Sequence, residues 1–93
     1  MAMATKAAWL KVDGGRVAQA LEEAEAGLDR AEGEVALDFS NVRRIDAAAL
    51  RAMESFAAIA DDKGVAVVLR GVDIAIYKVL KLVNLGSRFS FAS

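Results

Sequence analysis

Short apolar runs that alternate with amphipathic segments restrict the fold of this chain more than any other feature of its sequence. The clearest run, residues 65–69, contains no charge and lies between Gly64 and Gly71. A run of this kind is typical of a central strand that is covered on both faces of its sheet. A second run, residues 35–39, lies between Gly33 and a Ser-Asn pair, and it suits a buried strand better than a helix.

The segments between these runs have the periodicity of helices. In the first such segment, apolar residues recur every three or four positions, while acidic residues fall on the other side. Gly33 is expected to close this helix, and Asp46 is expected to cap the next one. The predicted order is strand 9–12, helix 17–31, strand 35–39, helix 46–63, strand 65–69, helix 73–83 and strand 88–91.

The regular alternation of strands and helices determines the predicted fold class. It favours an α/β domain in which right-handed crossovers pack about three helices on a mixed sheet of about four strands. The 93 residues suffice for one core of this kind and are too few for two. We therefore expect a single domain over residues 1–93.

The composition excludes several classes of function. The 12 basic and 13 acidic residues give a net charge of −1, which provides no field that would attract nucleic acid. Histidine and cysteine are absent, so the commonest agents of acid–base catalysis, thiolate chemistry and transition-metal binding are missing. We expect no catalytic site, no metal and no cofactor.

The most apolar stretch, residues 74–85, bears on membrane insertion. Two lysines interrupt it, and it is shorter than the roughly 20 residues that a spanning helix needs. The first eight residues also lack the long apolar core of a secretory signal. These features predict a cytoplasmic protein that does not insert into a membrane.

The most specific passage, residues 37–50, joins a buried strand to a capped helix. It resembles the signature of the STAS family, the domain of bacterial anti-sigma factor antagonists. In that family the strand ends in Asp-Leu-Ser, and an apolar residue followed by Asp precedes a Ser-Ser-Gly-Leu or Thr-x-Gly-Leu run that opens the helix. Here Asp-Phe-Ser at residues 38–40, Ile45, Asp46 and Leu50 match.

The resemblance extends over about residues 9–91. The family begins with a two-strand hairpin, whereas one strand is readable here, so the first strand is either absent or contained in residues 2–7. What the resemblance implies is a STAS-type fold that binds a protein partner. The downstream positions that agree with the family are Lys63, Gly64, Gly71, Val79, Leu80, Leu85 and Phe89.

Residue 48 decides what the resemblance implies about regulation. In phosphorylatable STAS proteins the acceptor is the serine or threonine two residues after the capping aspartate, and that position is Ala48 here. The start of a helix stabilises a bound phosphate, because free N–H groups and the positive end of the helix dipole lie there. The chain keeps the cap at Asp46 but lacks the acceptor. We therefore expect no phosphorylation there and a permanently dephosphorylated-like state.

One face of the second predicted helix is suited to a partner. At 100° per residue, Ala48, Arg51 and Ser55 fall in one line on the side opposite the apolar half. Small residues around one cation leave the backbone approachable, although an ordinary solvated face has the same pattern. Two arginines of the preceding loop stand next to this line. The predicted partner-binding residues are Arg43, Arg44, Asp46, Ala47, Ala48, Arg51 and Ser55.

Three other features have simpler explanations. Asp38 is expected to be a satisfied carboxylate at the end of its strand, in preference to a ligand site. The acidic residues of the first helix are expected to serve solubility. The last helix has a broad apolar arc that is expected to be mostly core and partly a contact with a partner or a second copy. The arc consists of Ile76, Tyr77, Val79, Leu80, Leu82 and Val83.

Two functional hypotheses follow from the resemblance. In the first, the chain is a non-enzymatic regulatory module of bacterial signalling and transcription that binds an anti-sigma factor or a kinase-like protein. In the second, it is a small cytoplasmic STAS subunit that docks on the ATPase of a lipid-trafficking ABC transporter. Neither involves nucleic-acid binding by this chain, and both leave dimerisation open.

Overall fold

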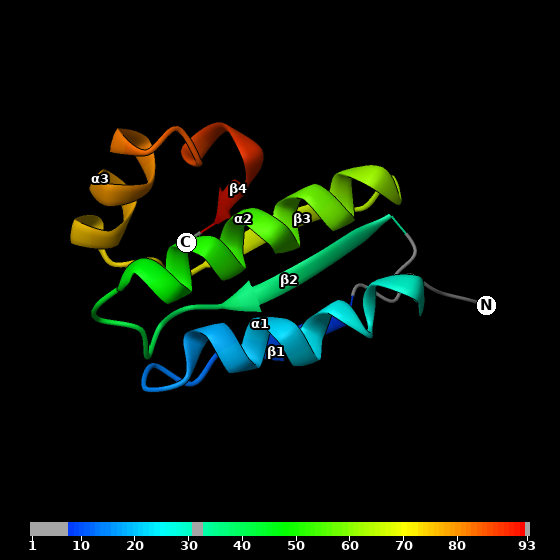
Figure 1. Cartoon of the computed structure of the whole chain (residues 1–93), viewed down its shortest axis with the longest axis horizontal. Coiled ribbons are helices and arrows are strands. Elements are labelled where there is room, and N and C mark those ends of the chain that lie inside the picture. The colour runs from blue at the N-terminus through cyan, green and yellow to red at the C-terminus, as the bar shows by residue number, and fades with distance from the viewer. Residues whose placement is uncertain (1–7, 31–32, 93) are drawn as a thin grey trace.

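In the part of the chain that the structure describes, four strands form one sheet against which the helices pack (Figure 1). This computed structural model describes residues 8–30 and 33–92. Strands and helices alternate along the chain in the predicted order. The elements are β1 (Ala8–Lys11), α1 (Val17–Glu25), a 3-10 turn (Leu28–Arg30), β2 (Glu34–Asp38), α2 (Ala47–Asp62), β3 (Ala66–Arg70), α3 (Ile74–Leu82), a second 3-10 turn (Gly86–Arg88) and β4 (Ser90–Ala92).

All strand pairs among the described residues are parallel, and the strands lie in the sheet in their chain order. One row of the register joins Leu10, Leu37, Leu69 and Phe91 across the sheet. The predicted α/β class with about four strands and three helices is confirmed. The sheet is parallel where a mixed one was expected. An antiparallel first strand in residues 2–7 would lie outside the described residues.

Within the described part, the sheet is covered on one face only. Strands that follow one another in order, joined by right-handed crossovers, place every connecting helix on the same side. Val67 and Leu69 of β3 belong to the core and are 4% and 0% exposed, whereas Ala66 and Arg70 on the other face are exposed. The prediction of a central strand over residues 65–69 is confirmed, but the prediction that both its faces are covered is wrong.

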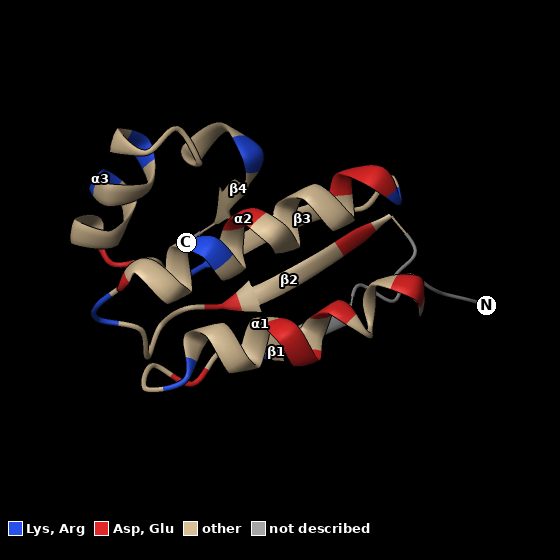
Figure 2. Cartoon of the chain, in the orientation of Figure 1, with Lys and Arg blue, Asp and Glu red and all other residues tan. Residues whose placement is uncertain are grey.

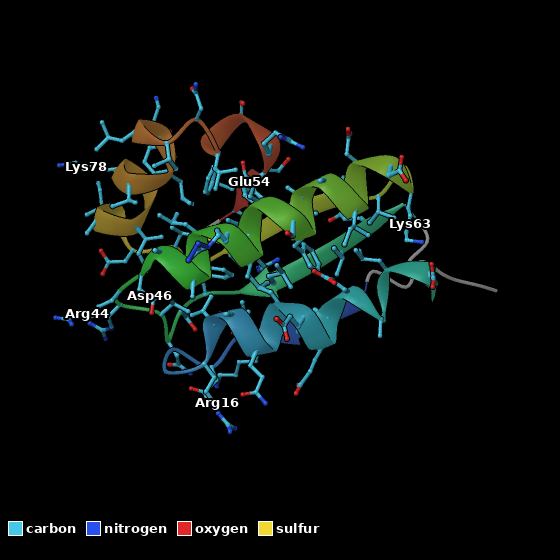
Figure 3. All side chains as sticks on the ribbon, viewed as in Figure 1. Arg16, Arg44, Asp46, Glu54, Lys63 and Lys78 are labelled. Carbon is cyan, nitrogen blue, oxygen red and sulfur yellow. The ribbon has the colours of Figure 1, made fainter. Side chains whose placement is uncertain are left out.

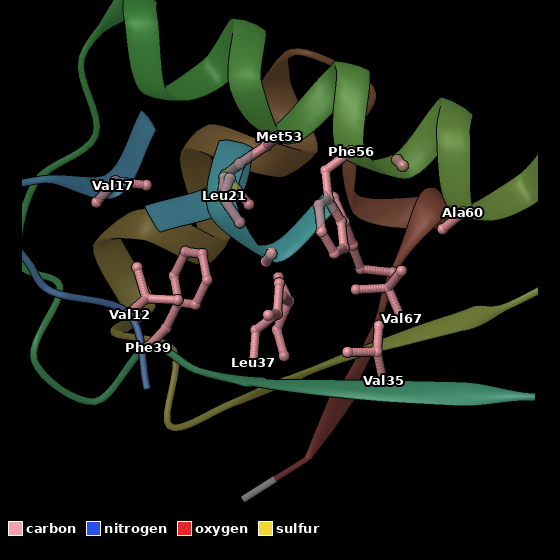
Figure 4. Close-up of a cluster of buried hydrophobic side chains, with 14 of the residues drawn as sticks. Val12, Val17, Leu21, Val35, Leu37, Phe39, Met53, Phe56, Ala60 and Val67 are labelled. Atoms are coloured by element: carbon pink, nitrogen blue, oxygen red, sulfur yellow. The ribbon is translucent and has the colours of Figure 1, made fainter. Parts of the chain in front are cut away.

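Core side chains fill the space between the sheet and the helices (Figure 4). Phe39, just after β2, and Phe56, in the middle of α2, are both 0% exposed. Ala57 and Ala60 on the same helix are also buried, and their small side chains let α2 approach the sheet closely. Burial of a side chain such as Phe56 stabilises the fold by roughly 1.5–3 kcal/mol.

Aspartate side chains cap the starts of α2 and α3. Asp46 Oδ1 accepts a hydrogen bond from Ala49 N at 2.8 Å, which confirms the predicted cap. Asp73 Oδ1 accepts one from Ala75 N at 2.9 Å and has the same role in α3. Each bond satisfies an N–H group that the first turn of a helix leaves without a partner.

The first helix, α1, is shorter than expected. A helix was predicted over residues 17–31, but α1 ends at Glu25, and the chain continues through Gly27 into a 3-10 turn. Glycine is a poor helix former, which favours a break at this point. Leu28 in the turn is still only 1% exposed, so it keeps its place in the core. The expected continuous helix closed by Gly33 is therefore wrong, because apolar spacing alone does not separate an α-helix from a following tighter turn.

Candidate protein-docking site

The loops that follow β1 and β2 lie against each other at one edge of the sheet. They meet because the carboxyl ends of parallel strands share one edge. A Cβ atom at Gly14 would stand 2.1 Å from the carbonyl oxygen of Asn41, so only glycine permits this approach. The contact brings the starts of α1 and α2 together, and Figure 3 shows Arg16, Arg44 and Asp46 at the same end of the molecule.

Local hydrogen bonds set the shape of the first loop. Asp13 Oδ1 accepts from Gly15 N at 2.9 Å, and the Asp13 carbonyl oxygen accepts from Arg16 N at 3.0 Å. Such bonds are the usual means by which an aspartate stabilises a tight turn. Val12, just before the loop, is 2% exposed and ties it to the core. The loop thus holds the first turn of α1 in a fixed position.

The approach of the two loops leaves a hollow between the starts of α1 and α2, which we call the loop hollow. It has a volume of about 440 Å³. Arg16 and Arg44 line it together with Asp46, whose carboxylate already accepts the capping bond. Its charged lining consists of two arginines and one carboxylate, and the positive ends of two helices lie beside it. Its lining residues are Gly14, Gly15, Arg16, Val17, Ala18, Gln19, Arg44, Asp46, Ala48 and Ala49.

A second hollow, of about 570 Å³, continues along the junction of α1 and α2. Glu22 and Glu25 of α1 line it together with Arg51 of α2, and small alanines lie between them. The ion pair seen among the described residues is a different one, Lys63 with Asp29. The charges of the second hollow are therefore available to a partner. We define the α1–α2 face as its lining residues, Ala18, Glu22, Glu25, Ala48, Arg51, Ala52 and Ser55.

The structure brings most of the predicted partner-binding residues to these two hollows. Ala48 lines both hollows and has an exposed side chain. Arg44 and Asp46 line the loop hollow, and Arg51 and Ser55 line the α1–α2 face. Arg43 and Ala47 are also exposed but line neither hollow. The predicted residues thus form a nearly continuous surface centred on the start of α2.

The contribution of α1 was missed in the sequence. Its acidic residues were assigned to solubility, yet Glu22 and Glu25 border the α1–α2 face. A signal was present, because Ala18, Glu22 and Glu25 follow one another at spacings of four and three and share one side of a helix. What the spacing could not show is that this side of α1 lies next to α2.

Asp38 lies outside this surface and has a structural role. Its Oδ1 accepts a hydrogen bond from Ser40 N at 2.9 Å. Hydrogen bonds from the Ser40 side chain and backbone lower the pKa of Asp38, with smaller contributions from the charges of Lys11 and Arg70. The carboxylate is therefore bonded to the following loop as predicted.

Helix length and ligand spacing also bear on what the site can do. No helix in residues 8–30 and 33–92 is long and apolar enough to cross a membrane. The same residues bring no three acidic, histidine or cysteine side chains together in a way that could hold a metal ion. The surface offers cations, carboxylates and small apolar residues, so it can make charge-complementary contacts with another protein.

Comparison with protein families agrees with the resemblance seen in the sequence. A family model described as "Mlab, STAS domain" matches residues 11–89, which is most of the chain. The chain belongs to the STAS domain family. No curated protein matches it significantly. STAS domains generally mediate contacts between proteins, so membership agrees with a docking surface at the start of α2.

Proposed function

We propose that this chain is a non-enzymatic regulatory module that binds a protein partner through the α1–α2 face, in the manner of an anti-sigma factor antagonist. The observation that carries the proposal is the start of α2, where Ala47 and Ala48 are exposed and Ala48 borders both hollows. A partner can approach the backbone closely there, and the charges of Arg51 and Glu22 stand beside the contact.

The same surface supports constitutive binding. Ala48 occupies the position that carries the phosphate acceptor in switchable STAS proteins, and it has no hydroxyl. A phosphate would add roughly −1.5 to −2 charges at the point of contact and block a partner. Without the acceptor, the module binds whenever its partner is present in the bacterial cytoplasm.

Two matched variants, each with glutamate in place of one alanine of α2, test this proposal. Ala48→Glu places a charge at the centre of the surface, while Ala58→Glu makes the same change at an exposed residue of α2 about 15 Å further along the helix. A negative charge in the first turn of a helix is stabilised by the helix dipole, so the Ala48→Glu variant should still fold. We expect affinity capture with the wild-type chain and with Ala58→Glu to recover the same anti-sigma factor or kinase-like protein. Capture with Ala48→Glu should recover at least about ten-fold less of that protein.

Equal recovery by both variants would contradict the proposal.

A phosphorylation assay adds an independent check on the alignment at residue 48. Incubated with a kinase that phosphorylates STAS proteins, the wild-type chain should take no label in residues 46–50, whereas Ala48→Ser should become labelled. Label in that segment of the wild-type chain would contradict the absence of the switch.

A second candidate function rests on the family description. That description names Mlab and no anti-sigma factor antagonist. The second candidate function is therefore that the chain docks on the ATPase of a lipid-trafficking ABC transporter. The same capture experiment separates the two functions, because an ATPase would then be the protein that Ala48→Glu loses. Genes for a permease and an ATPase beside this gene would favour the transporter.

A further inference from the structure

Much of the apolar surface of α3 is exposed. Ile76 and Leu80 are buried, whereas Ile74 and Leu82 are 70% and 84% exposed. Of the predicted apolar arc, Tyr77, Leu82 and Val83 are 37%, 84% and 46% exposed, so the expectation that this arc is mostly core is wrong. Because α3 lies over the end of the sheet at β4, it has sheet beneath only one side (Figure 1). The remaining apolar side chains form a candidate contact surface.

An aromatic pair forms a ridge on this surface. The rings of Tyr77 in α3 and Phe91 in β4 lie with their centroids 4.9 Å apart at 84°, and Lys81 Nζ stands 5.7 Å from the centre of the Tyr77 ring. Hollows of about 400 and 310 Å³ both include the two aromatic residues in their lining, so the ridge separates them. The first is lined by Gly71, Val72, Ile74, Tyr77, Phe91 and Ala92, and the second by Tyr77, Lys81, Asn84, Gly86, Ser87 and Phe91.

The outer edge of β4 is free among the described residues. β4 is the last strand of the sheet, and Ala92 O accepts from Gly71 N at 3.3 Å on the β3 side. Successive residues of a strand direct their N–H and C=O groups to opposite sides. The N–H and C=O of Phe91 therefore face the free edge, next to the ridge. An edge of this kind is a template for an added strand.

The charge of this region restricts the occupant. Residues 72–92, which run from the first hollow to the end of β4, contain three basic residues, Lys78, Lys81 and Arg88, and one acidic residue, Asp73, whose carboxylate caps α3. The rest of the chain has nine basic and 12 acidic residues. Figure 2 shows the cations on α3 and the following turn and the acidic residues along α1. A second copy that used the same face would bring like charges together, which is unfavourable.

We propose that the free edge of β4 and its two hollows bind an extended acidic peptide segment of another protein as an added strand. Apolar side chains two residues apart, about 6.7 Å along a strand, enter the hollows on either side of the ridge. Carboxylates that flank them meet Lys78 and Lys81. This α3–β4 face, the lining of the two hollows together with Lys78, is independent of the α1–α2 face and gives the module a second contact.

A designed peptide tests the surface directly. The probe is acetyl-Glu-Ser-Val-Thr-Val-Ser-Glu-amide, in which both valines and both glutamates share one face of a strand. Titrated into the ¹⁵N-labelled chain, it should cause saturable NMR shifts at Tyr77, Phe91 and Ala92 at millimolar concentration or below. The same peptide with lysine in place of both glutamates should bind at least about ten-fold more weakly, because the cations of the surface repel it.

Two variants of α3 form a matched pair. Ile74→Ser removes an apolar side chain from the lining of the first hollow without adding a charge, and it should weaken peptide binding at least about ten-fold. Leu82→Ser makes the same change at an exposed residue that lines neither hollow and should leave binding unchanged. Both side chains are largely exposed, so both variants should fold, and their NMR spectra verify this.

Several outcomes would overturn the proposal. These are no saturable shifts up to millimolar peptide, shifts centred elsewhere, equal binding of the lysine peptide, or equal losses in the two variants. Dimerisation in sedimentation equilibrium that Ile74→Ser abolishes would assign the face to a second copy. Cosedimentation with phosphatidylglycerol vesicles that depends on Leu82 would assign it to a membrane surface.

Discussion

The α1–α2 face and the α3–β4 face lie on the same side of one sheet but differ in what their helices bury. α2 packs on both α1 and β3, and it buries Met53 and Phe56 together with three alanines. α3 is the more apolar helix, yet it buries only Ile76 and Leu80, because it lies at the end of the sheet. The comparison teaches that position over the sheet, more than the apolar content of a helix, decides how much apolar surface is left for a partner.

The largest effect should come from the buried side of α3. Leu80 is 0% exposed, and Leu80→Ala should lower the free energy of unfolding by about 2–5 kcal/mol through lost burial and a cavity. Leu82→Ala on the exposed side should change it by less than about 0.5 kcal/mol. Urea denaturation of both variants measures the difference. Equal losses would mean that α3 is covered on both sides, which would remove the contrast between the two faces.

A smaller loss is expected where the two loops support the α1–α2 face. Gly14→Ala would force a Cβ against the carbonyl oxygen of Asn41 and should cost about 1–3 kcal/mol as the loops separate. At Gly15 the nearest atom to an added Cβ is Asp13 Oδ1 at 3.6 Å, so Gly15→Ala is the control and should be tolerated. Thermal unfolding measures both. A Gly14→Ala variant as stable as the wild type would show that the loops are not held together here.

The helix caps should give losses of about 1 kcal/mol. Asp46→Ala removes the bond to Ala49 N, and Asp73→Ala removes the bond to Ala75 N. We expect the two variants to lose similar amounts of unfolding free energy in urea denaturation, since both helices start with the same kind of aspartate cap. Asp46→Asn can still accept the bond and should retain most of the stability. A loss from Asp46→Asn equal to that from Asp46→Ala would point to the charge of Asp46 instead of its capping bond.

The smallest effect should come from the far end of α2, away from both faces. Lys63 Nζ lies 2.5 Å from Asp29 Oδ1, and this bond lowers the pKa of Asp29 and raises that of Lys63. The Asp29 contribution to stability is present above the unfolded carboxyl pKa and is lost as pH falls through the lowered folded value. The Lys63 contribution is lost as pH rises through its raised value.

Between these limits the pair is exposed and screened by salt, so its contribution is small. Lys63→Met should cause a slight fall in stability at pH 7 that disappears in 1 M NaCl, as measured by thermal unfolding in the two buffers. A loss that persists in high salt would mean that the Lys63 side chain stabilises the fold by packing and not by charge.

The sequence supported most of the fold and about half of the docking surface. Apolar runs and capping residues placed β2, α2, β3 and α3 within one or two residues, because local propensity and burial agree there. The helix expected over residues 17–31 was too long, since its apolar spacing continues through the 3-10 turn. For the surface, the line of Ala48, Arg51 and Ser55 was visible in the sequence, whereas its neighbours on α1 were not.

By itself the sequence determined the alternation of elements and the aspartate cap of α2. These depend on residues close together in the chain, whose spacing and side-chain chemistry are local properties. Only the tertiary structure decided that the described strands have one covered face, that Glu22 and Glu25 line the same hollow as Arg51, and that Phe91 meets Tyr77 at an edge of β4 that pairs with no other described strand. Strand order and crossover handedness set these contacts, and they join residues that are far apart in the chain.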